Sequence, residues 1–217
     1  MGKQPSGYPE RVRVDGPHPG EELNEGAETE PRQAASIVVL RDAAEGPEVL
    51  LVQRNPQQRF MGGAWVFPGG GVHSDDADHA AAAVRELEEE AGVRLPADHP
   101  VVPWSRWITP AEVVVRFDTY FFVTEAPPGA EATVDGGECV DARWLRPTAA
   151  LEAHERGKLM LVFPTIKHLE ALAGMGSVAE TLEKARTREV VPVQPRVVVR
   201  DGAAEVVLPG EPGYEQA

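Results

Sequence analysis

The chain has 217 residues, of which 42% are hydrophobic, and a formal net charge of −14 at pH 7. This length fits one ordinary domain with tails, and the acidic charge disfavours a protein that binds nucleic acid through a general basic field. No apolar run reaches the roughly 18 residues of a membrane-spanning helix, and residues 1–16 show no secretory signal. We therefore expect a soluble, cytoplasmic protein whose partner is neither nucleic acid nor membrane.

The first predicted elements follow an N-terminal lead-in of residues 1–33, which is rich in Pro, Gly and Glu and has no apolar period. Runs rich in Val, Ile and Leu at 36–40 and 48–54 predict two paired strands, because a turn-forming cluster separates them. A short third strand is expected at 64–67. It stops before Gly69–Gly71, which we interpret as a tight turn.

The clearest helix in the sequence runs from about Asp76 to Ala91, with many alanines in its first half. Asp75 or Asp76 can cap its start, and Gly92 marks its end. Further elements follow in chain order: strands at 101–109, 112–126 and 139–145, and helices at 150–157, 164–174 and 177–188. The pattern predicts a mixed α/β domain over 34–188. Two β-rich arms around Asp201-Gly202 predict a hairpin within a C-terminal extension, 189–217.

Three glutamates of the predicted helix, Glu86, Glu89 and Glu90, share one face, because each residue advances by about 100°. Glu88 points elsewhere. Clustered carboxylates repel one another, which raises their pKa values unless positive charge lies between them. Arg85 can reach Glu89 at the i,i+4 spacing, and a hard cation such as Mg²⁺ or Mn²⁺ offsets more. By composition alone a run of glutamates on a helix is most often a solvated face. Its spacing from the preceding glycines therefore decides between a solvated face and a metal site.

Residues 85–93 resemble the second half of the Nudix box, G-x5-E-x7-R-E-U-x-E-E-x-G-U, whose first glycine corresponds to Gly71. Ala77 stands where the box has its first glutamate. Three neighbouring aspartates are candidates to replace that side chain: Asp75, Asp76 and Asp78. The resemblance implies a Nudix α/β/α sandwich with a mixed sheet. It also implies metal-dependent hydrolysis of a nucleoside diphosphate linked to another group, with Mg²⁺ or Mn²⁺ as cofactor and a small nucleotide as substrate.

The segment 50–70 is similar to the signature of coenzyme A diphosphatases, with Arg54 and Arg59 in register. Val52, Asn55 and His73 depart from the residues that this signature prefers. The resemblance implies cleavage of coenzyme A or an acyl-CoA to 3′,5′-ADP and a phosphopantetheine. Two alternatives stay open: a Nudix hydrolase for ADP-ribose, NADH or another nucleotide diphosphate, and a non-catalytic Nudix-like domain that binds a nucleotide and regulates a partner.

The family resemblance assigns the metal to Glu86, Glu89 and Glu90, beside Arg85. A general base comes either from one of these glutamates or from a later loop, where Glu138 is our candidate. An exposed glutamate at a strand edge is an equally good interpretation of Glu138.

Substrate-binding residues are expected at the glycine segment and at two arginines: Gly69, Gly70, Gly71, Arg54 and Arg59. Guanidinium groups suit phosphate oxygens, although each arginine is as readily a surface residue.

Other conspicuous side chains have ordinary explanations. Packing explains Trp65, Trp104 and Trp107, and solvated positions explain His73 and His79. Cys139 is expected to be a small, buried strand residue. The sequence leaves the oligomeric state open, with a homodimer as one alternative.

Overall fold

A mixed β-sheet forms the centre of the protein in a computed structural model that describes residues 23–24, 28–200 and 203–216. Most of the predicted lead-in, 1–33, lies outside these residues. The main path of the sheet has the order β3-β2-β1-β6-β5-β8, while β4 pairs with β1 and β7 pairs with β2. The strands of this sheet are β1 (Arg32–Ala43), β2 (Gly46–Arg54), β3 (Trp65–Val66), β4 (Gly69–Gly71), β5 (Val102–Ile108), β6 (Phe117–Glu125), β7 (Cys139–Leu145) and β8 (Pro192–Val193).

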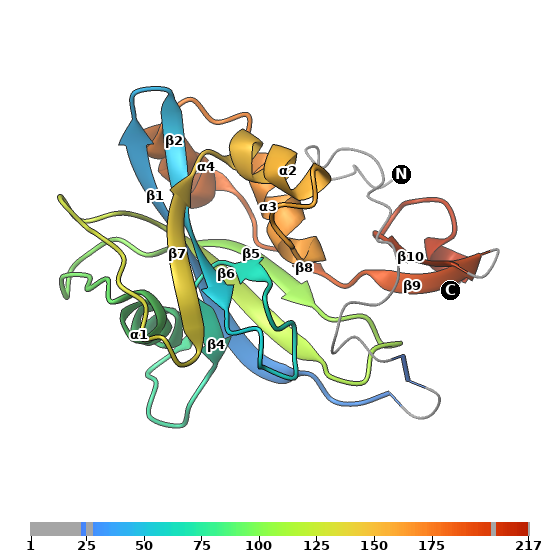
Figure 1. Ribbon diagram of the computed structural model, residues 1–217. Helices are drawn as coiled ribbons and strands as arrows, with labels where there is room; N and C mark the ends of the chain where they lie inside the picture. Colours follow the sequence, from blue (N-terminus) through green and yellow to red (C-terminus); the bar gives the residue numbers. More distant parts are fainter. Residues whose placement is uncertain (1–22, 25–27, 201–202, 217) are drawn as a thin grey trace.

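Helices cover both faces of the sheet (Figure 1). They are α1 (His79–Ala91), α2 (Pro147–Glu155), α3 (Phe163–Leu172) and α4 (Val178–Thr187). One apolar cluster lies beneath α1 and contains its Leu87, and a second cluster, on the opposite face, contains Leu169 of α3 and Leu182 of α4. The predicted α/β/α sandwich is therefore confirmed. The three tryptophans predicted to serve packing are buried in the second cluster: Trp65, Trp104 and Trp107.

The two central strands, β1 and β6, run parallel to each other, whereas β1 and β2 form the antiparallel pair that the sequence predicted. Residues 37–40 of β1 are at most 1% exposed. Because helices cover the sheet on both sides, these residues form a continuous apolar run instead of alternating with polar ones. This explains why the run at 36–40 is easy to recognise in the sequence.

The predicted strand over 112–126 begins only at Phe117, so its first five residues were assigned wrongly. Pro110 starts a turn in which the amide of Val113 donates to the Pro110 carbonyl at 3.2 Å. Arg116 is then buried at 3% exposure, and its guanidinium donates to a carboxylate oxygen of Glu28 at 2.6 Å. A buried charge needs such a partner, and Glu28 supplies it.

The C-terminal stretch forms the expected hairpin, in which β9 (Arg196–Arg200) and β10 (Ala203–Val207) pair antiparallel. Its predicted turn, Asp201-Gly202, lies outside the described residues. The hairpin extends beyond the main sheet near β5 and β8 (Figure 1). A short 3₁₀ helix, Tyr214–Gln216, follows it, and the Tyr214 hydroxyl donates to the carbonyl of Gln194 at 2.9 Å. Among the described helices, none combines the length and apolar character that spanning a bilayer requires.

Candidate active site

Helix α1 presents the glutamates, and its start differs from the prediction. Asp78, not Asp75 or Asp76, is the N-cap: its side chain accepts a hydrogen bond from the amide of Ala81 at 2.8 Å, so the helix begins at His79. Carboxylates satisfy the free amides of a first helical turn in this way. The predicted end is correct, because Gly92 adopts the left-handed conformation (φ 66°) at the C-cap.

Asp76 cannot cap the helix because it binds Arg85. Its two carboxylate oxygens accept from Nε and Nη2 of Arg85, each at 3.0 Å, and one of them also accepts from the amide of His73 at 2.8 Å. The Arg85 guanidinium thereby lowers the pKa of Asp76 to about 2. Of the three aspartates considered as replacements for the box glutamate at position 77, Asp76 is the one that pairs with Arg85.

The remaining donors of Arg85 organise the acidic face. Nη1 donates to Glu86 at 2.7 Å and to Glu89 at 2.9 Å, which confirms the predicted i,i+4 contact. Nη2 also donates to the carbonyl of Gly71 at 2.9 Å. One guanidinium therefore ties together the loop before α1, strand β4 and two of the three glutamates.

The three glutamates share a side of α1 but differ in environment. Glu86 and Glu90 are buried, whereas the Glu89 side chain is 56% exposed. Burial raises the pKa of Glu86 despite the opposing effect of Arg85, and it raises the pKa of Glu90 to about 7 despite a hydrogen bond from the Gly69 amide. Two carboxylates are thus held where their negative charge is poorly solvated.

Gly69–Gly71 form strand β4, so the predicted tight turn is wrong. These residues pair antiparallel with residues 34–36 of β1, and the Gly69 amide donates to a carboxylate oxygen of Glu90 at 2.9 Å. Glycine is needed at position 70 for a different reason from the one expected. A Cβ on Gly70 would lie 2.5 Å from Oε1 of Glu86, so any side chain at this position would force the Glu86 carboxylate to move.

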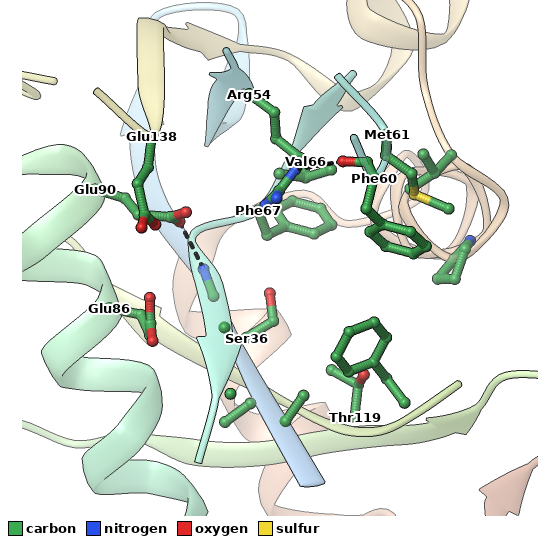
Figure 2. A pocket seen from close by; sticks show the side chains of 18 of the residues that line it. Ser36, Arg54, Phe60, Met61, Val66, Phe67, Glu86, Glu90, Thr119 and Glu138 are labelled. Carbon is green, nitrogen blue, oxygen red and sulfur yellow. Dashed lines mark hydrogen bonds between the residues drawn. The ribbon is translucent and has the colours of Figure 1, made fainter. Parts of the chain in front are cut away.

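These elements surround a cavity of about 630 Å³, part of which Figure 2 shows. One wall is acidic: Glu86, Glu89, Glu90, Asp135 and Glu138. Opposite the labelled glutamates lie Phe60, Met61 and Thr119 (Figure 2). All three predicted substrate-binding glycines also line the cavity.

Glu138 is exposed and directly precedes β7, which begins at Cys139 as the sequence predicted. Its negative charge contributes to raising the pKa of Glu86, in agreement with their shared position at the cavity. Cys139 follows it as the buried strand residue that was expected, and burial raises the pKa of its thiol, so it is not a ready nucleophile.

The two candidate arginines end up in different places. Arg54 lines the cavity, and it donates to the side chain of Gln58 and, at 3.4 Å, to the carbonyl of Phe60. Arg59 is exposed and is not among the residues that line the cavity. Of this pair, the structure brings only Arg54 to the glutamates.

Asp135 is a cavity residue that the sequence interpretation missed. Its carboxylate accepts hydrogen bonds from the amides of Glu138 and Cys139, both at 3.1 Å. These bonds fix the short loop that presents Glu138 to the cavity. The signal was available, because an aspartate directly before Gly136-Gly137 is typical of an Asx-type turn in which the side chain bonds to following amides.

The donor set fits a hard divalent cation, because buried carboxylates with raised pKa values favour a neighbouring positive charge. In the part of the chain that the structure describes, however, no three of these side chains converge closely enough to hold an ion by themselves. Glu86 and Glu89 point to Arg85, and Glu90 points to the Gly69 amide.

The protein is thus an α/β/α sandwich, and carboxylates beside helix α1 line its cavity. The NUDIX domain model matches residues 30–163, which are more than half of the chain. The chain belongs to this family.

Two curated relatives are similar to parts of the chain. Nudix hydrolase 7 of Caenorhabditis elegans is 27% identical over 180 residues, covering 65% of this chain and 60% of the relative. The Nudix hydrolase NudL of Citrobacter koseri is 44% identical over 75 residues, covering 34% of this chain and 35% of the relative. The chain therefore spans no more than 60% of the length of these relatives.

Two solved structures are similar in fold. A NUDIX hydrolase from Alicyclobacillus acidocaldarius has a TM-score of 0.64 and 27% identity, covering 75% of this chain and 98% of its own. The NUDIX domain of Shewanella oneidensis NrtR, solved in complex with ADP ribose, has a TM-score of 0.53 and 16% identity, covering 66% of this chain and 86% of its own. At that identity the second likeness shows the fold alone.

Proposed function

We propose that the protein is a metal-dependent hydrolase that cleaves the phosphoanhydride of a nucleoside diphosphate linked to another group. The observation that carries this proposal is the gathering of Glu86, Glu89, Glu90 and Glu138 on one cavity together with Arg54. Membership of the NUDIX family supports it, as do relatives named as hydrolases.

The charge of the cavity argues for a cation as cofactor. Five carboxylates line it, and among the described lining residues Arg54 is the one guanidinium. A diphosphate entering such a cavity would be repelled unless positive charge neutralised the acidic wall. When bound, Mg²⁺ or Mn²⁺ supplies that charge and makes a nearby water more acidic. We assign its binding to Glu86, Glu89 and Glu90.

The remaining chemistry belongs to side chains of this chain. Arg54 contacts phosphate oxygens and orients the diphosphate, because a guanidinium matches their geometry. A water oxygen bonds to one phosphorus while the bond from that phosphorus to the bridging oxygen breaks, and the bridging oxygen leaves with the other phosphate. The proton of the water passes to a carboxylate, either Glu138 or one of the three glutamates of α1.

For the substrate we propose coenzyme A or an acyl-CoA, cleaved to 3′,5′-ADP and a phosphopantetheine. The similarity of residues 50–70 to the coenzyme A diphosphatase signature supports this choice. The position of Arg54 at the cavity supports it as well. The second candidate is a Nudix hydrolase of ADP-ribose or NADH, in line with the NrtR domain that was solved with ADP ribose. The third is a regulatory domain without activity.

A substrate panel with product identification tests all three candidates. Coenzyme A, an acyl-CoA, ADP-ribose, NADH and a dinucleoside polyphosphate are incubated with Mg²⁺, with Mn²⁺ or with a chelator. We expect turnover only with metal, and fastest for the coenzyme A compounds. Much faster turnover of ADP-ribose would replace the substrate assignment, and nucleotide binding without any cleavage would favour the regulatory domain.

Glutamine variants test the metal assignment. Glu89→Gln and Glu90→Gln should each lower kcat by orders of magnitude with the fold intact. Glu88→Gln is the matched control, because Glu88 lies on the same turn but pairs with Arg94 at 2.7 Å and does not line the cavity. Wild-type turnover in both test variants would overturn the assignment. A cytoplasmic location and a homodimer stay predictions, for cell fractionation and sedimentation to check.

A further inference from the structure

A second pocket of about 120 Å³ lies beside the main cavity, and we call it the hairpin pocket. The two share five lining residues: Phe60, Met61, Thr119, Phe121 and Pro164. The remaining wall comes from β5, from the loop after it, from α3 and from the C-terminal hairpin: Trp107, Ile108, Thr109, Pro110, Val113, Val115, Phe163, Pro195, Val197 and Val206. The hairpin pocket therefore adjoins the main cavity.

The wall of the hairpin pocket is apolar. None of the described residues that line it is charged, and its polar side-chain groups are the hydroxyls of Thr109 and Thr119 and the indole N–H of Trp107. A charged or strongly polar group would lose its water there without gaining enough partners, whereas an aliphatic chain would gain free energy by leaving water. The acidic wall of the main cavity and this apolar wall thus suit opposite ends of one molecule.

The hairpin presents its valines to the pocket by strand pairing. Val197 of β9 and Val206 of β10 are directly opposite in the antiparallel register, so their side chains lie on the same face. Glu112 holds the hairpin against the loop that completes the pocket: its carboxylate accepts from the Val197 amide at 3.1 Å and from Nε of Arg196 at 3.4 Å. The C-terminal extension is therefore part of the wall.

We propose that the hairpin pocket is a specificity subsite for an aliphatic segment of the substrate half that is not the nucleotide. The assignment rests on the proposed function, since it takes the diphosphate to be bound in the main cavity. The occupant is part of the substrate, not a separate partner, because the pocket is small and shares its walls with the cavity that holds the acidic site.

The test uses ADP esterified at its terminal phosphate with straight alkyl groups, from methyl to decyl. Turnover with Mg²⁺ gives kcat/KM, and calorimetry gives the dissociation constant. Each added methylene that enters the pocket should tighten binding by about fourfold, until the pocket is full. A dissociation constant that does not change with chain length would overturn the inference.

Variants of the hairpin assign the effect to the pocket. Val197→Phe fills the space and should abolish the gain from longer chains, whereas Val197→Ala enlarges it and should move the optimum to a longer chain. Val198→Phe is the matched control, because the neighbouring residue of a strand points to the opposite face. It should keep the wild-type dependence. If Val197→Phe does not fold, Val206→Phe and Val197→Ala still decide, and an unchanged optimum in both would reject the subsite.

The same experiment separates this inference from the proposed function. Binding that strengthens with chain length, without cleavage of any ester, would retain the subsite and reject the hydrolase. Cleavage at a rate and affinity independent of chain length would retain the hydrolase and reject the subsite.

Discussion

Arg85 depends on an aspartate that stands one residue before the position at which the Nudix box has a glutamate. Asp76 occupies both Nε and Nη2 of Arg85, and its side chain is only 7% exposed. With these donors taken, Nη1 is left pointing at Glu86 and Glu89. The family glutamate is absent at Ala77, and the carboxylate of the preceding residue, Asp76, pairs with Arg85.

Removing this replacement should disturb the acidic face. We expect Asp76→Ala to lower activity or metal affinity by about 10- to 100-fold, as loss of a partner that orients a metal ligand usually does. Adding Ala77→Glu to this variant should restore part of the loss, because it returns a carboxylate to the family position. Steady-state kinetics against Mg²⁺ concentration measures both effects.

The control for the two Asp76 variants is Asp75→Asn. Asp75 is exposed, and its carboxylate accepts a hydrogen bond from the neighbouring Ser74 hydroxyl at 3.1 Å. The Asp75→Asn variant should behave as wild type. An Asp76→Ala enzyme with unchanged kinetics would mean that Arg85 keeps its place without this aspartate.

At the scale of elements, strand β4 passes so close to the Glu86 side chain of helix α1 that a methyl group at position 70 would displace the carboxylate. A Cβ at position 70 would meet both oxygens of the Glu86 carboxylate, at 2.5 and 2.7 Å. A Cβ at position 71 would have no other atom within 4 Å. Two adjacent glycines therefore have very different roles.

We expect Gly70→Ala to lower the free energy of unfolding by about 1–3 kcal/mol, the usual range for overpacking, and to reduce turnover strongly by displacing Glu86. Gly71→Ala should change the free energy of unfolding little, because its Cβ meets no other atom within 4 Å. Chemical denaturation and kinetics of the two variants make the comparison. Equal effects of the two substitutions would contradict the role given to this close approach.

For the molecule as a whole, the buried His168 of α3 links stability to pH. Its Nδ1 lies 2.6 Å from the Pro164 carbonyl, which can only accept, so Nδ1 carries the proton. Nε2 then accepts from the Ser105 hydroxyl of β5, also at 2.6 Å. A neutral imidazole thus joins α3, which contributes to the cavity wall, to the central sheet.

Burial lowers the pKa of His168 to about 4, against 6.5 for an unperturbed histidine. The unfolded chain therefore takes up the proton first, and the stability that this residue contributes is complete above pH 6.5 and is lost as the pH falls towards 4. The expected loss between pH 7 and pH 5 is about 2 kcal/mol. Urea unfolding at both pH values should show it in the wild type and not in His168→Gln. The matched substitution of the half-buried His99, His99→Gln, should leave this pH-dependent loss of stability in place. A His168→Gln protein that still showed the loss would exclude His168 as its source.

Much of this protein follows from short-range order in its sequence. The phase of α1, which places Glu86, Glu89 and Glu90 on one side, depends only on helical geometry, and the i,i+4 contact of Arg85 with Glu89 follows from the same geometry. The sequence also predicted the strands with continuous apolar runs and the two arms of the hairpin, because strand formation and turn composition are largely local.

Long-range packing decided the rest. Asp76 and Asp78 have the same side chain two positions apart, and only the position of the Arg85 guanidinium makes one its partner and the other a helix cap. The glycines of β4 became a strand because β1 lies beside them. The hairpin pocket joins residues more than 100 positions apart. Local propensity acts over about one helical turn, so the residues that meet across a cavity are determined only when the chain has packed.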